Sequence, residues 1–158
     1  MDLTVLDNVA FAVQARQGHS FHFWTPARSI PTLREPAMEY LDRTGLAARR
    51  HETAGVLSHG ERRQLEIAMA LAGEPRLMLL DEPMAGMGAE ETARMIDLLK
   101  SLSGRTILLV EHDMDAVFAL ADRITVLVYG RVIASGPPDQ VRSDPEVVRA
   151  YLGDAAAC

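Results

Sequence analysis

The chain has 158 residues, 48% of them apolar, which is enough for one domain with a hydrophobic core. Its formal net charge of −6 disfavours direct electrostatic binding to nucleic acid or to an anionic membrane surface. Cys158 is the only cysteine, which excludes an internal disulfide, and no apolar run reaches the ~20 residues of a bilayer-spanning helix.

Two amphipathic helices are predicted in the first 45 residues, over 3–16 and 33–43, with Gly45 ending the second. Their inward-facing residues are expected to be Leu6, Val9, Ala10 and Val13 in the first helix and Leu33, Ala37, Tyr40 and Leu41 in the second. The stretch between them holds His19 and His22 among aromatic residues. A metal site there remains open, but loop packing is favoured because no further matched ligand follows. Residues 49–51 form a basic run that is interpreted as a solvated face.

Residues 57–61, Leu-Ser-His-Gly-Glu, predict a turn that leads into a helix. Ser58 and Glu61 have the spacing of a capping box. A capping box alone does not explain Gly60, because glycine costs about 1 kcal/mol relative to alanine inside a helix. A glycine permits close backbone approach, and free N–H groups at a helix N-terminus bind phosphate. The helix that follows is expected to bury Leu65, Ala68, Met69 and Ala72 and to end at Gly73.

Two apolar runs, residues 77–80 and 106–110, predict strands of a parallel sheet that is covered on both faces. Asp81 and Glu82 follow the first run, and ligands in such sheets bind at the carboxyl ends of the strands. A metal or water site is therefore favoured over a solvated loop start. His112 follows the second run at the same edge, which favours a functional role for this histidine.

The rest of the chain alternates between helices and strands. Helices are predicted over residues 89–102, 114–121, 139–142 and 145–152, and strands over residues 124–128 and 132–134. The order strand, helix, strand, helix, strand is typical of an α/β parallel sheet with right-handed crossovers.

Together these motifs resemble the ATP-binding subunits of ABC transporters over nearly the whole chain. Residues 57–61 resemble the LSGGQ signature, with His59 for the first glycine and Glu61 for the glutamine. Residues 77–82 resemble the Walker B strand, and residues 84–88 stand in the D-loop position, where Gly88 replaces the usual aspartate or asparagine. The stretches VEHDMDAVFALADRITVL, GRVIASGPPDQV and DPEVVRAYLG resemble most closely the subunits of branched-chain amino acid importers.

The resemblance implies an α/β fold, namely the C-terminal portion of a P-loop NTPase of the ABC type, with a helical subdomain and a partial parallel sheet. Residues 1–75 would form the helical subdomain with the signature and its helix. Residues 76–135 would form the RecA-like α/β portion with Walker B, the D-loop and the switch histidine. Residues 136–158 would form a C-terminal helical tail.

The resemblance also implies ATP and Mg²⁺ as cofactors and a transport ATPase as the activity. The site residues would be Ser58, His59, Gly60 and Glu61 for nucleotide binding, Asp81 for the metal, Glu82 as general base and His112 on the γ-phosphate. The expected partners are a second ATP-binding subunit, identical or different, and integral membrane permease subunits. No contact with nucleic acid or with the solute is expected, and the place of action would be the cytoplasmic face of the inner membrane.

Lysine usage bears on the activity of the isolated chain, because Lys100 is the only lysine. Leu99 precedes Lys100, so the chain has no P-loop of the form GxxxxGK[ST]. We therefore expect an N-terminally shortened subunit that is inactive alone. Two alternatives remain open: a non-catalytic interaction fragment, and a non-transport ABC-type ATPase acting on DNA or ribosomes. The second would predict heptad repeats or basic patches, and the sequence has neither.

Overall fold

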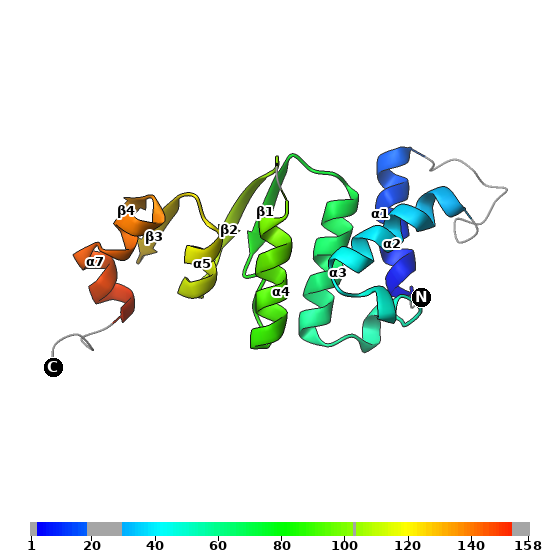
Figure 1. Cartoon of the computed structure of the whole chain (residues 1–158), viewed down its shortest axis with the longest axis horizontal. Helices are drawn as coiled ribbons and strands as arrows, with labels where there is room; N and C mark the ends of the chain where they lie inside the picture. Colours follow the sequence, from blue (N-terminus) through cyan, green and yellow to red (C-terminus); the bar gives the residue numbers. More distant parts are fainter. Residues whose placement is uncertain (1–2, 19–29, 103, 153–158) are drawn as a thin grey trace. The chain divides into compact units, whose positions relative to one another are not determined.

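The computed structural model describes residues 3–18, 30–102 and 104–152, and the chain divides into two compact units, Met1–Glu111 and His112–Cys158 (Figure 1). The first unit contains α1 (Val5–Gln17), α2 (Pro31–Arg43), the 3₁₀ turns η2 (Ala47–Arg49) and η3 (Ala54–Val56), α3 (His59–Ala72), β1 (Leu77–Asp81), α4 (Ala89–Lys100) and β2 (Thr106–Val110). The division after Glu111 falls within residues 76–135, and the three-part division by motif stays a prediction.

Helices α1, α2 and α3 pack against one another and form the helical part of the first unit. Every inward-facing residue predicted for α1 and α2 is buried. The end of α2 is fixed by Gly45, whose φ of +79° lets the chain leave the helix in the left-handed region. The N–H groups of Gly45 and Leu46 then donate to the carbonyls of Asp42, at 3.1 Å, and Leu41, at 2.8 Å.

The predicted apolar face of α3 is partly wrong. Leu65, Ala68 and Ala72 are buried, but Met69 is 37% exposed. Ile67 and Leu71 are buried instead, so the buried stripe is rotated around the helix. The reason is tertiary: α3 contacts both α1 and α2, and the direction of these two neighbours decides which part of a broad apolar surface is covered.

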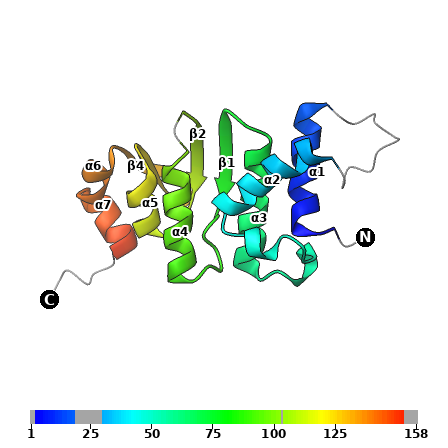
Figure 2. The same cartoon turned by 45° about the vertical axis from the view of Figure 1, so that its right-hand side comes forward.

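Strands β1 and β2 pair in parallel, as predicted, with Leu77 opposite Thr106 and Asp81 opposite Val110. Figures 1 and 2 show α4 alongside this pair and α3. Met95, Leu98 and Leu99 of α4 are buried, as is Met78 of β1.

The expectation that both faces of this pair are covered is wrong for the part of the chain that the structure describes. Successive residues of a strand point to opposite faces, and the face that carries Leu79 is exposed. Its large apolar residues are Leu77, 54% exposed, Leu79, 69%, Leu108, 59%, and Val110, 57%. One strand pair with a helix on one side therefore leaves an apolar sheet face in contact with solvent.

The second unit contains α5 (Met114–Leu120), β3 (Ile124–Val128), β4 (Arg131–Gly136), α6 (Pro138–Arg142), α7 (Pro145–Val147) and the π-helical turn η4 (Val148–Leu152). Its core is formed by Ile124, Val126, Val141 and Val147, against which Phe118 packs. Strand β3 pairs antiparallel with β4. Among the described residues it pairs with neither β1 nor β2, so the expectation that it continues the parallel sheet is wrong for this part of the chain. Tyr129 and Gly130, with φ of +48° and +74°, make a tight turn between them, and such a short connection joins only antiparallel strands.

Candidate functional site

The N-terminus of α3 is closed by the capping box predicted for Ser58 and Glu61. The Ser58 hydroxyl accepts the Glu61 N–H at 3.2 Å, and the Glu61 carboxylate accepts the Ser58 N–H at 2.8 Å. Among the described residues, the N–H groups of His59 and Gly60 have no hydrogen-bond acceptor. Two unsatisfied donors thus remain at the positive end of this helix, which is an arrangement that can accept an anion.

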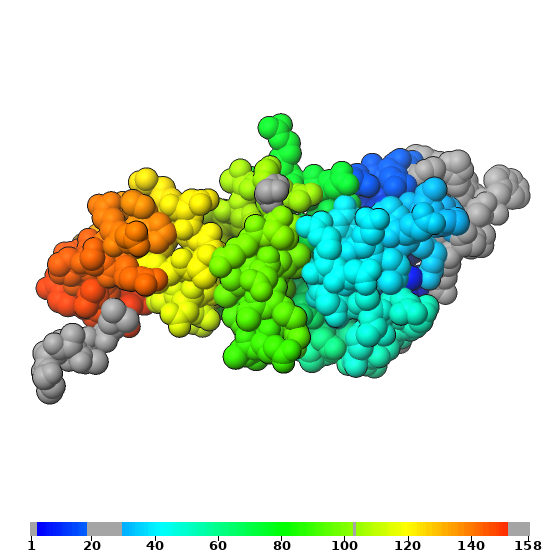
Figure 3. All heavy atoms as spheres, in the orientation of Figure 1, coloured from blue at the N-terminus to red at the C-terminus, as the bar shows by residue number. Residues whose placement is uncertain are grey.

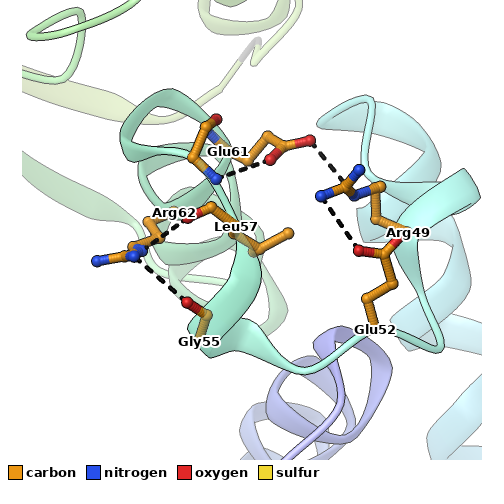
Figure 4. Close-up of polar contacts among 7 residues, drawn as sticks. Arg49, Glu52, Gly55, Leu57, Glu61 and Arg62 are labelled. Atoms are coloured by element: carbon orange, nitrogen blue, oxygen red, sulfur yellow. Dashed lines mark hydrogen bonds and ion pairs between the residues drawn. The ribbon is translucent and has the colours of Figure 1, made fainter.

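Glu61 also contacts a residue that sequence reasoning assigned to solvent (Figure 4). Arg49 Nε lies 3.5 Å from Glu61 Oε1, and Arg49 Nη2 lies 3.1 Å from Glu52 Oε2. The interpretation of residues 49–51 as a solvated face holds for His51, which is exposed, but Arg49 is half-buried and pairs with two carboxylates. The pair is partly exposed, so its contribution to stability is small, but it neutralises the carboxylate at the position where the signature usually has a glutamine.

Arg62 holds the turn that precedes α3 (Figure 4). Its Nε donates to the Leu57 carbonyl at 3.0 Å and its Nη2 to the Gly55 carbonyl at 3.4 Å. Sequence reasoning missed this residue. One clue was available in the sequence. Arg62 lies in the first turn of the helix, next to a chain reversal whose carbonyls lack partners, and its guanidinium has five N–H donors.

Asp81 and Glu82 lie at the carboxyl end of β1, as predicted, and both are exposed. The Glu82 N–H donates to the Val110 carbonyl at 2.8 Å and extends the parallel ladder by one bond. Glu82 has a φ of +46°, which is uncommon for a residue with a side chain and costs about 1–3 kcal/mol. Glu74 and Tyr129, outside the candidate site, have φ of +49° and +48°, so this strain does not single out Glu82.

The turn after Glu82 is held from several sides. The Met84 N–H donates to Glu111 Oε1 at 2.9 Å, which ties the turn to the end of β2. The Gly88 N–H donates to Glu91 Oε2 at 3.0 Å, at the start of α4. Sequence reasoning did not predict that Glu111 holds this turn. His112 follows Glu111 and is the first residue of the second unit.

Gly60 permits a close approach, as expected, but the groups that approach it belong to the same chain. A Cβ atom at Gly60 would lie 3.0 Å from Glu91 Oε2 and 3.4 Å from Met87 Cγ. The start of α3 and the start of α4 are therefore neighbours within the first unit.

The residues expected to hold Mg²⁺ fit this ion in part. Asp81 offers an exposed carboxylate, and Mg²⁺ commonly takes one or two carboxylates together with water and phosphate oxygens. Within the described ranges, no three His, Cys, Asp or Glu side chains come together to form a complete metal site. His19 and His22 lie outside the described residues.

An open cleft of about 310 Å³ lies between the end of α2 and α4, whose atoms are neighbours on the face shown in Figure 3. It is lined by Asp42, Arg43, Thr44, Gly45, Gln64, Arg94, Met95, Asp97, Leu98 and Ser101. None of the predicted site residues lines it, so this cleft is separate from the candidate site.

Two family matches show to which protein family the chain belongs. The ABC transporter family matches residues 2–85, just over half of the chain. This chain belongs to the ABC transporter family. Residues 131–157 match a second family, described as branched-chain amino acid ATP-binding cassette transporter, as the resemblance of the C-terminal stretches predicted.

Relatives and solved structures agree with this family. BraF of Pseudomonas aeruginosa, a high-affinity branched-chain amino acid transport ATP-binding protein, is 37% identical over 162 residues, and LivG of Escherichia coli, which has the same description, is 38% identical over 162 residues. Each match covers 98% of this chain but 64% of the relative. MJ1267, an ATP-binding cassette of an ABC transporter, superposes with a TM-score of 0.75 at 28% identity, over 94% of this chain and 62% of MJ1267.

These matches confirm the predicted α/β fold of an ABC-type cassette. The chain spans less than two thirds of the length of these relatives. Within residues 3–18, 30–102 and 104–152, no helix combines the length and hydropathy of a membrane-crossing segment.

Proposed function

We propose that this chain is part of the ATP-binding subunit of an ABC importer for branched-chain amino acids. The observation that carries the proposal is that Asp81 and Glu82, at the end of a parallel strand, share one compact unit with the signature-like N-terminus of α3. The match of residues 131–157 supports branched-chain amino acids as the solute class. BraF and LivG, which are named for this transport, support it as well.

The proposed reaction transfers the γ-phosphoryl group of ATP to water, which depends on positioning and charge stabilisation more than on covalent chemistry. Glu82 would accept a proton from the attacking water as general base. Asp81 would hold Mg²⁺, which when bound neutralises charge on the phosphates. His112 would donate a hydrogen bond to the γ-phosphate.

The signature-like turn would act on the nucleotide of a second ATP-binding subunit. The Ser58 hydroxyl and the unsatisfied N–H groups of His59 and Gly60 would face its phosphates, at the positive end of α3. Glu61 would line the same contact while paired with Arg49. Two nucleotides would then lie between two subunits, which makes dimer formation part of the function.

The remaining partners would be integral membrane permease subunits, through which the solute passes without touching this chain. The chain would then work at the cytoplasmic face of the inner membrane, bound through the permease. A net charge of −6 gives no reason to expect a nucleic acid partner.

The proposal is tested with a chimaera in which this chain replaces the matching region of BraF. In a Pseudomonas aeruginosa strain that lacks BraF, the chimaera should restore uptake of labelled leucine. Failure of a correctly folded and ATP-binding chimaera to restore leucine uptake would contradict the proposed solute class.

The catalytic role of Glu82 is tested in the same chimaera. Glu82→Gln should leave ATP binding intact and lower ATP turnover by a factor on the order of 10² to 10⁴, because the general base is lost. Glu90→Gln, which removes an exposed carboxylate that pairs with Arg94, is the matched control and should keep normal turnover. Normal turnover in Glu82→Gln would remove Glu82 from the mechanism.

A further inference from the structure

The imidazole ring of His59 lies directly on Gly86. A Cβ atom at Gly86 would lie 2.6 Å from His59 Cδ2, 3.4 Å from Cγ and 3.5 Å from Nε2. Real side chains do not approach a ring carbon to 2.6 Å, so the ring occupies the space that a side chain at position 86 would need. Gly86 therefore meets two separate requirements: a left-handed φ of +74° and the absence of a side chain beneath the ring.

This contact joins two segments that have their own supports elsewhere. The turn over residues 84–88 is tied at one end to Glu111 and at the other to Glu91. The His59 ring presses on the middle of this turn, and the Gly60 backbone packs against Met87 and Glu91 beside it. His59 and Gly86 are both exposed, so the contact lies at the surface, where the ring covers the backbone of the turn from one side.

We infer that His59 is a positioning residue that holds the turn after Glu82 against the N-terminus of α3. The ring fills the space above Gly86, so the two segments keep one relative position. The consequence for catalysis, a fixed placement of Ser58 relative to Glu82, rests on the proposed function. The contact between His59 and Gly86 does not depend on the proposed function, and it can be tested without a nucleotide.

The first test is a comparison of two glycine substitutions in the full chain. Gly86→Ala introduces the strain of a left-handed φ and a clash with the ring. Gly104→Ala introduces the same strain alone, because Gly104 has a φ of +77° and a Cβ atom added there would meet no atom within 4 Å. Gly86→Ala should therefore lower the folding equilibrium constant more than Gly104→Ala, by a factor of a few, because the exposed ring of His59 has to be displaced from Gly86 as well.

The decisive arm repeats both substitutions in a His59→Ala background, with urea unfolding as the measurement. Removal of the ring should abolish the excess cost of Gly86→Ala, so that the two glycine substitutions become equal. The inference would be overturned if Gly86→Ala cost no more than Gly104→Ala in the wild-type background. It would also be overturned if the extra cost of Gly86→Ala persisted in the His59→Ala background.

Amide hydrogen exchange provides a readout that a general loss of stability does not imitate. The Met87 N–H donates to the Met84 carbonyl at 3.1 Å, and the Gly88 N–H donates to Glu91, so both amides are expected to be protected. His59→Ala should speed exchange at Met87 and Gly88 by about tenfold and leave Leu46, at the end of α2, unchanged. Equal acceleration at all three amides, or none at Met87 and Gly88, would show that His59 does not position the turn. Because no ATP is involved, these results stand or fall separately from the proposed ATPase activity.

Discussion

Ser58 stabilises α3 through one hydroxyl oxygen. That oxygen accepts the Glu61 N–H, which would otherwise have no partner in the first helical turn. Ser58→Ala should lower the free energy of unfolding by about 1 kcal/mol, the usual cost of losing an N-cap side chain. Urea denaturation followed by circular dichroism measures the loss.

Ser58→Asn is the matched control, because asparagine supplies a side-chain oxygen at the same position. It should retain most of the stability. The same loss in both variants would mean that the hydroxyl does not act as a cap.

At the scale of elements, Glu74 connects the ends of three helices. Arg16, in the last turn of α1, forms an ion pair with Glu74, which follows α3. The Tyr40 hydroxyl of α2 donates to Glu74 Oε1 at 3.2 Å. The hydrogen bond from Arg16 lowers the pKa of Glu74. Burial, followed by the charge of Glu74, raises the pKa of Tyr40.

The lowered pKa of Glu74 predicts how acid affects this cluster. The folded state favours the ionised carboxylate, so its stabilising effect is present above the pKa of Glu74 in the unfolded chain and is lost as the pH falls through the folded pKa. Wild type should therefore lose more stability on acidification than Glu74→Gln, which has no charge to lose. Urea midpoints measured from neutral to acid pH show the difference.

Glu66→Gln is the control for the loss of a surface carboxylate, because Glu66 pairs with Arg63 and its side chain is 61% exposed. It should follow the wild-type pH dependence more closely than Glu74→Gln does. Parallel curves for wild type and Glu74→Gln would contradict the role of Glu74. The raised pKa of Tyr40 matters at alkaline pH. The folded state favours the neutral hydroxyl, so stability is lost as the pH rises through the pKa of Tyr40 in the folded chain.

At the scale of the whole molecule, the exposed face of the β1–β2 pair predicts self-association. Leu79 and Leu108 are adjacent on this face and more than half exposed. Apolar sheet surface next to unpaired strand edges favours contact with other chains. Leu79→Lys should raise the monomer fraction in sedimentation velocity, since it places a charge in the centre of the face.

Val56→Lys is the matched control, because Val56 is 61% exposed and lies in η3, away from the strands. It should leave association unchanged. A monomeric wild-type chain, or equal effects of both substitutions, would contradict the prediction.

The isolated chain is also expected not to bind Mg-ATP with useful affinity. Its only lysine, Lys100, is in the last turn of α4, and the sequence holds no GxxxxGK[ST] motif to supply the amide cradle and lysine that hold the β- and γ-phosphates. Isothermal titration should show no binding at micromolar concentrations, whereas the chimaera with BraF should bind. Micromolar binding by the isolated chain would show that the argument from the missing P-loop is wrong.

Features that depend on short-range chemistry were predictable from the sequence. The caps at Ser58 and Gly45 and the buried faces of α1 and α2 follow from residues that lie within two helical turns of one another. Parallel pairing of two apolar strands joined through a helix was also predictable, because such a connection is long enough for a crossover. The order of motifs along the chain was sufficient to predict the family.

Features that depend on which segments meet were not predictable from the sequence and required the folded structure. The exposure of Met69 and the open face of β1–β2 depend on where neighbouring helices lie, which periodicity does not contain. The contacts of Glu61 with Arg49 and of Gly86 with His59 join residues 12 and 27 positions apart in the printed sequence. A local pattern specifies which residues prefer burial or a cap, but the partner across such a separation is chosen by the packing of the whole unit.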